Sequence, residues 1–195
     1  MTDGPGRRER KKAATRHAIS EAAMELFAER GFDAVSVREV AEHADVSPTT
    51  VFAHFPQKEA LVFDEDDERR DAMIAAVRER VSGTSVSTAL LGFFKDGMDD
   101  EADYADQMQR FRTLISETTS LREYEQRMWL NHATELASAI ADELGLAEAT
   151  PEIRAYARCA VDIPLLASAD PEPRAFLTRG FALLDGGWSA YVASL

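Results

Sequence analysis

The sequence predicts an all-α protein of nine helices. Apolar residues recur at spacings of three and four along most of the chain, as they do on one face of an amphipathic helix. We find neither the strict apolar–polar alternation of a strand nor a hairpin turn of the Asn-Gly type. Proline, which interrupts helices, accounts for only 7 of 195 residues. At 45% apolar residues, the chain has the composition of a globular protein with a packed core.

The first helix is expected to run from about Arg8 to Arg30. Gly31 should end it, because glycine readily adopts the backbone conformation that closes a helix. Phe32 follows and should fold back onto the last turn. The apolar stripe of this helix consists of Ile19, Ala22, Ala23, Leu26 and Phe27.

Two short helices come next. Ser36 with Glu39 three residues later is a capping box, which predicts the start of the second helix. The segment 44–46 should break it, and Ser47 should cap a third helix that has Pro48 at its first position. Two short helices joined by a turn of three or four residues are typical of a helix-turn-helix, whose second helix enters the DNA major groove. Two ordinary capped helices joined by a turn are the alternative.

Phe55-Pro56 should end the third helix, and a fourth is expected from about Gln57-Lys58 to Val81. Pro164 lies inside the eighth helix and should kink it or end it early. The remaining helices are expected near residues 85–97, 102–117, 121–144, 151–168 and 172–193.

The net charge of −13 is distributed unevenly. Residues 1–60 carry 9 Lys/Arg and 10 Asp/Glu, a net charge of −1, whereas residues 61–195 carry 13 and 25, a net charge of −12. A locally basic arm on an acidic body suits a protein that meets phosphates at one end, although a solvated tail would look the same. The basic residues of the arm are Arg7, Arg8, Arg10, Lys11, Lys12 and Arg16.

The stretch from Ala22 to Leu61 reads AAMELFAERGFDAVSVREVAEHADVSPTTVFAHFPQKEAL. It closely resembles the DNA-binding domain of the TetR family of transcriptional regulators, and the resemblance extends over residues 12 to about 62. Many spaced positions agree in order. They are Leu26-Phe27, Glu29 to Phe32, Ser36 to Ala41, Val46-Ser47, Phe52 to Phe55, and Lys58-Glu59 with Leu61.

The resemblance implies a DNA-binding site. Ser36 would hold a phosphate at a helix N-terminus, with Arg38 placed to reach backbone or base. Phe52 stands where the family usually has tyrosine, so one hydroxyl contact to phosphate is in doubt. The recognition helix would present Ser47, Pro48, Thr49 and Thr50 to base edges, while His54 and Lys58 would lie at the phosphate backbone. A partly buried structural role is the alternative for His54.

By the same resemblance, residues 1–60 form the DNA-binding domain with its basic arm, and residues 61–195 form a helical ligand-binding and dimerisation domain. A homodimer would form through the last two helices, about residues 151–193, which carry apolar residues from Ile153 to Trp188. The alternative is that these residues pack within one subunit. Small residues such as Ala155, Ala157, Ala160 and Ala167 would allow close approach. Candidate ligand contacts, each also consistent with plain core, are Phe93, Phe94, Met98, Met108, Phe111, Leu114, Met128, Trp129 and His132.

The resemblance therefore predicts a cytoplasmic repressor that a small-molecule ligand releases from a palindromic operator. A DNA-binding regulator that responds to a partner protein, or to nothing, is the alternative. We expect no enzyme activity, because no nucleophile motif or glycine-rich phosphate loop occurs. We expect no metal or cofactor, since the four histidines lack metal-ligand spacing and Cys159 is the only cysteine. The sequence contains no run of about 18 apolar residues, so we expect no membrane contact.

Overall fold

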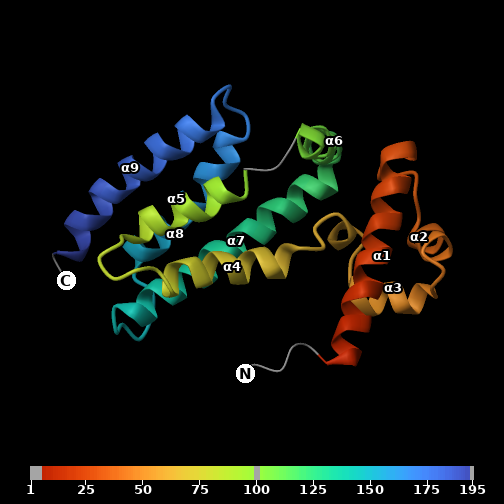
Figure 1. The fold of residues 1–195 in the computed structure, drawn as a ribbon, viewed down its shortest axis with the longest axis horizontal. Coiled ribbons are helices and arrows are strands. Elements are labelled where there is room, and N and C mark those ends of the chain that lie inside the picture. The colour runs from red at the N-terminus through yellow and green to blue at the C-terminus, as the bar shows by residue number, and fades with distance from the viewer. Residues whose placement is uncertain (1–5, 99–101, 194–195) are drawn as a thin grey trace. The chain divides into compact units, whose positions relative to one another are not determined.

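The computed structural model describes residues 6–98 and 102–193, and every regular element in these ranges is a helix, as predicted (Figure 1). One short 3₁₀ helix, η1, accompanies the nine α-helices of the described residues. In chain order they are α1 (Arg7–Arg30), α2 (Val37–His43), α3 (Pro48–His54), η1 (Glu59–Leu61), α4 (Asp66–Arg78), α5 (Val86–Asp96), α6 (Ala102–Glu117), α7 (Thr119–Glu143), α8 (Pro151–Ala167) and α9 (Pro173–Val192).

The chain divides into two compact units. The first consists of the described residues up to Asp66 together with Asp103–Glu125, and the second of Asp67–Ala102 and Gln126–Leu195 as far as they are described. The first unit thus draws on two separate parts of the chain. The division expected from the sequence, after residue 60, follows chain order and stays a prediction.

In the first unit, α1 packs against α2 and η1, and α2 packs against α3. Gly31 ends α1 with a positive φ of 81°, and its N–H donates to the Phe27 carbonyl over 2.9 Å. The rings of Phe27 and Phe32 lie 4.9 Å apart, which confirms that Phe32 folds back onto the last turn. The core of these helices includes Ile19, Ala23, Phe27, Val40, Ala41, Val51 and Phe55.

The expectation that a fourth helix begins at Gln57-Lys58 is wrong. The chain makes only the short turn η1 there, and α4 begins at Asp66. Tertiary packing explains the delay, because the buried side chain of Phe63 stacks on Tyr124 at 5.3 Å and meets Phe111 edge-on at 5.8 Å. Those partners lie about 50–60 residues away in sequence, so no local pattern announced them.

The same helix also ends earlier than Val81, at Arg78. The Arg80 guanidinium donates to the Val77 carbonyl over 2.5 Å and to the Thr84 carbonyl over 2.9 Å. It therefore supplies hydrogen bonds to a helix-terminal carbonyl that lacks an intrahelical partner. Its remaining N–H groups pair with the Glu143 carboxylate on α7, and this contact holds the pKa of Glu143 below its usual value.

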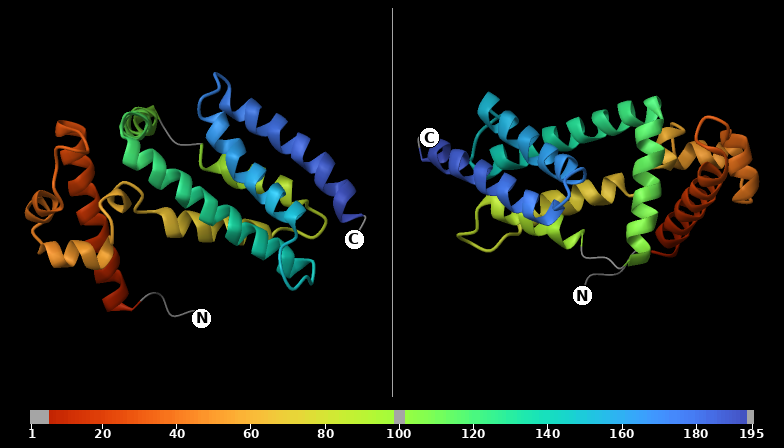
Figure 2. Two further views of the ribbon diagram at one scale, coloured as in Figure 1. Left: turned by 180° about the vertical axis from the view of Figure 1, so that it is seen from behind. Right: turned by 90° about the horizontal axis from the view of Figure 1, so that it is seen from above.

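The second unit is organised around α9, which packs along α5 and α8 (Figures 1 and 2). Most of the apolar residues named for the last two helices are buried within the single chain, and the expected dimer interface stays a prediction. Pro164 does not end α8, which continues to Ala167. The buried residues concerned are Ile153, Tyr156, Ala157, Ala160, Val161, Ala167, Leu177, Phe181 and Trp188.

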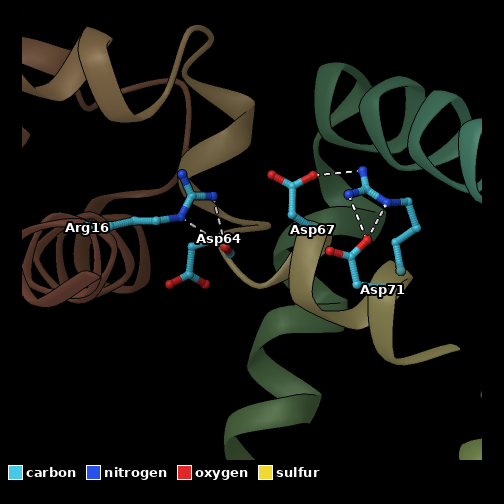
Figure 3. Close-up of polar contacts among 5 residues, drawn as sticks. Arg16, Asp64, Asp67 and Asp71 are labelled. Atoms are coloured by element: carbon cyan, nitrogen blue, oxygen red, sulfur yellow. Dashed lines mark hydrogen bonds and ion pairs between the residues drawn. The ribbon is translucent and has the colours of Figure 1, made fainter. Parts of the chain in front are cut away.

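The second unit also contains an ion cluster of one half-buried arginine and two exposed carboxylates. Arg70 on α4 pairs with Asp67 over 2.8 Å and with Asp71 over 2.9 Å, as Figure 3 shows. Part of the acidic run after residue 60 is thus neutralised locally. No described helix is long and apolar enough to cross a membrane.

Candidate nucleic-acid interface

The first helix of the candidate site, α2, begins with the predicted capping box. The Ser36 hydroxyl accepts from the Glu39 N–H over 3.2 Å, and the Glu39 carboxylate accepts from the Ser36 N–H over 2.8 Å. Bonds from the backbone and hydroxyl of Ser36, together with the Arg30 guanidinium at 2.8 Å, lower the pKa of Glu39 to about 2. Ser36 is exposed, but the groups that were expected to hold a phosphate already bind Glu39 in the free protein.

The turn between α2 and α3 depends on a residue that the sequence did not single out. Asp45 has a positive φ of 51°, a conformation that suits glycine best and asparagine or aspartate next. The turn closes with bonds from the Ala44 N–H to the Val40 carbonyl and from the Val46 N–H to the Ala41 carbonyl, each 2.9 Å long. These bonds set the direction in which α3 leaves α2.

The second helix, α3, is capped by Ser47, whose hydroxyl accepts from the Thr50 N–H over 3.1 Å. Pro48 occupies the first turn, as predicted. The Thr50 hydroxyl lies 2.8 Å from that of Ser47, so it takes part in the cap. Pro48 and Thr49 are exposed, and Phe52 is 52% exposed on a helix whose other large apolar residue, Val51, is buried. The outer face of α3 thus presents small polar groups and one uncovered aromatic ring.

Arg38 and His54, two further predicted DNA contacts, differ in their accessibility. Arg38 is highly exposed and pairs with Glu42 over 3.0 Å. His54 is half-buried, and burial, reinforced by the charges of Arg16 and Lys12, lowers its pKa. The imidazole therefore favours its neutral form, which meets a phosphate as a hydrogen-bond donor and not as a cation.

Lys58 does not open a helix, contrary to the sequence-based expectation. Its Nζ donates to the Phe32 carbonyl over 2.5 Å and lies 4.0 Å from the centre of the Phe32 ring. Burial lowers the pKa of Lys58. The ammonium therefore links the segment before η1 to the turn after α1. To contact a phosphate as predicted, it would have to weaken or break its hydrogen bond to the Phe32 carbonyl.

The basic arm forms the first turns of α1. Arg7, Arg8, Arg10, Lys11 and Lys12 are exposed, as phosphate-binding residues must be, whereas Arg16 is half-buried. The signal for this difference is present in the sequence, because Arg16 stands three and four residues before the buried Ile19 and Ser20 and shares their face of the helix.

The candidate ligand residues fall in both units. Phe111 and Leu114 belong to the first unit, the side chain of Met108 lies outside the described residues, and the others belong to the second. Trp129 is 7% exposed, and its indole N–H has no hydrogen-bond acceptor among the described residues. The buried ring of His132 lies edge-on to it at 5.0 Å. The ligand site stays a prediction.

An open hollow of about 660 Å³ lies elsewhere in the second unit, where α4 and α7 end around the loop 81–84. None of the predicted ligand residues lines it. Its charged side chains pair with one another, Arg78 with Asp142 over 3.2 Å and Arg80 with Glu143. Among the described residues, no three His, Cys, Asp or Glu side chains are arranged to hold a metal ion.

Capped α2 and α3, joined by a tight turn and braced by α1, define a helix-turn-helix protein. A model of the family described as bacterial regulatory proteins, tetR family, matches residues 19–64. The transcriptional regulator TcmR of Streptomyces glaucescens is 32% identical over 132 residues, which are 64% of this chain and 58% of TcmR. The helix-turn-helix of this chain is therefore similar to the DNA-binding domain of the tetR family over residues 19–64.

The likeness to solved structures covers nearly the whole chain. GusR of Salmonella enterica has a TM-score of 0.57 at 22% identity, with 89% of this chain and 94% of GusR aligned. A complex of SmeT with triclosan has a TM-score of 0.51 at 17% identity, with 91% of each chain aligned. At these identities the structures show a shared fold, which therefore extends beyond the helix-turn-helix into the acidic part of the chain.

Proposed function

We propose that this chain is a sequence-specific DNA-binding transcription regulator that reads its operator with α3. The observation that carries the proposal is the outer face of α3, where Thr49 is exposed at the N-terminal end and Phe52 is uncovered beyond it. Short polar side chains at the start of such a helix can approach base edges closely in the major groove. The exposed cations at the start of α1 supply the charge that phosphates require.

We further propose that the regulator is a homodimer with α8 and α9 at its interface. Leu166 on α8 is 62% exposed and Leu183 on α9 is 83% exposed. Large exposed leucines on two packed helices favour a second copy as their cover. In a dimer, two recognition helices would enter successive major grooves roughly 34–36 Å apart, so the operator would be palindromic.

The third part of the proposal is that a small molecule releases the repressor from its operator. Support comes from SmeT, a protein of the same fold whose solved structure is a complex with triclosan. In this chain the buried indole N–H of Trp129 offers a donor to an acceptor group. A regulator controlled by a partner protein is the competing possibility, and a titration of the protein–operator complex with fractionated cell extract separates the two.

The DNA-binding proposal is tested by selecting duplexes from a random pool and measuring their affinity at several salt concentrations. For roughly 6–10 phosphate contacts per dimer, affinity should fall by about 10³–10⁵ between 50 and 200 mM salt. Failure to enrich any sequence, or binding that ignores salt, would refute the proposal. Sedimentation equilibrium checks the dimer, since a monomer of 21.6 kDa at micromolar concentration would contradict it.

Two substitutions separate base reading from backbone contact. Thr49→Ala should relax discrimination at one position of each half-site by roughly 1–3 kcal/mol. Lys58→Ala should weaken binding to all sequences alike and make the salt dependence shallower by about 1, because the ammonium would shift from the Phe32 carbonyl toward a phosphate when DNA binds. Thr134→Ala, an exposed threonine on α7, is the matched control and should leave both quantities unchanged. Altered base preference in Lys58→Ala with intact preference in Thr49→Ala would contradict the assignment of α3.

A further inference from the structure

Arg16 differs from the other cations at the start of α1 in what its guanidinium contacts. Its Nη1 donates to the His54 carbonyl over 2.8 Å. Its Nε and Nη2 donate to the Asp64 carbonyl over 3.2 and 2.8 Å, a pair of bonds visible in Figure 3. The guanidinium carbon also lies 4.3 Å from the centre of the buried Phe55 ring. Three N–H groups and one face of the cation are thus engaged within the protein.

Both carbonyls occupy places where the backbone needs a partner. His54 is the last residue of α3, and the terminal carbonyls of a helix have no intrahelical donor. A cation at that end also interacts favourably with the helix dipole. Asp64 lies in the connector between η1 and α4. One side chain of α1 therefore holds the C-terminal end of the candidate recognition helix and the connector that follows it.

We propose that Arg16 is a positioning residue for DNA recognition, and that it is not one of the phosphate-binding cations of the basic arm. This inference rests on the proposed DNA-binding function. By fixing the end of α3 against α1, Arg16 sets the angle at which Thr49 and Phe52 meet the groove. The guanidinium of Arg16 donates to carbonyls of the protein itself. Replacing Arg16 should therefore leave the number of counterions released on DNA binding unchanged.

The test compares Arg16→Gln with Lys12→Gln, because Lys12 lies one helical turn earlier and is exposed. Affinity for a selected duplex is measured between 50 and 200 mM salt. Arg16→Gln should weaken binding by about tenfold or more at every salt concentration while leaving the salt slope unchanged, since charged hydrogen bonds within the protein are lost. Lys12→Gln should make the slope shallower by about 0.9 if Lys12 meets one phosphate.

Hydrogen exchange on the free protein provides a measurement that needs no DNA. Arg16→Gln should speed exchange of amides in residues 52–66, Lys12→Gln should not, and Arg16→Lys should be intermediate because lysine reaches one carbonyl at a time. A shallower salt slope for Arg16→Gln with unchanged exchange would overturn the inference. If exchange changes as expected but the wild-type protein selects no DNA, the contact stands, whereas the proposed function and the role of Arg16 in recognition both fail.

Discussion

Removing the buried hydrogen bond between Ser87 and Tyr156 should reveal how strongly α5 is held to α8. The two hydroxyl oxygens lie 2.7 Å apart, and the residues are 1% and 5% exposed. A buried hydroxyl that loses its partner costs about 1–3 kcal/mol. Tyr156→Phe strands the Ser87 hydroxyl but keeps the ring against Trp188, 4.2 Å away, so its loss should be about 1–2 kcal/mol.

The double variant carries the sharper expectation. Ser87→Ala should also cost about 1–3 kcal/mol, because it strands the phenol of Tyr156. Replacing both groups leaves no stranded hydroxyl, so the double variant should lose less than the sum of the single losses, with a coupling of about 1–2 kcal/mol. Urea unfolding followed by circular dichroism measures all four proteins. Additive losses would refute the reasoning, since they would mean that the two hydroxyls do not depend on each other.

The same pair makes a prediction about alkaline pH. Burial raises the pKa of Tyr156 to about 12, and its bond to Ser87 only partly offsets this. The unfolded chain ionises near pH 10, so the stability that the neutral phenol contributes is complete below pH 10 and is lost as pH rises toward 12. The difference in unfolding free energy between the wild type and Tyr156→Phe should therefore shift in favour of the variant over that range.

Three further predictions concern single positions. The stability contributed by Glu39, whose pKa is lowered to about 2, should be lost as pH falls below about 4.5, so Glu39→Gln should approach the wild type in acid denaturation curves. Asp45→Gly should raise the unfolding free energy by up to about 1 kcal/mol, because it relieves a positive φ of 51°. Gly180→Ala should lower the unfolding free energy measured in urea by about 1 kcal/mol, because the new methyl would lie 2.9 Å from Ile163 Cγ2. Gly92→Ala meets no atom within 4 Å and should raise the unfolding free energy by about 1 kcal/mol.

The helix boundaries that follow from short-range chemistry could be predicted from the sequence. The capping box of Ser36 and Glu39, and the cap of Ser47 with Pro48 behind it, involve residues at most three positions apart. Their geometry repeats wherever a helix starts, so the residue types are sufficient. The same holds for Gly31, whose positive φ the sequence indicated through the end of the apolar stripe.

Helix boundaries and side-chain contacts that depend on residues far away in the sequence could not be predicted in the same way. The start of α4 depends on Phe63 packing against Tyr124, and Arg16 reaches the Asp64 carbonyl 48 residues later. Composition marked Arg16 as one more cation of a basic arm. Its actual partners follow from the packing of α1 against the end of α3 and the connector, which no spacing within α1 encodes.

For the last two helices, the sequence by itself determined that both are amphipathic and contain a broad apolar surface. Only the tertiary structure decided which part of that surface is covered within one chain. Tyr156 and Phe181 are buried there, whereas Leu166 and Leu183 remain exposed. The hydrophobic effect is non-directional, so an apolar stripe predicts that this face of the helix will be buried but does not predict which neighbour buries it. That choice is made when α5, α8 and α9 pack together.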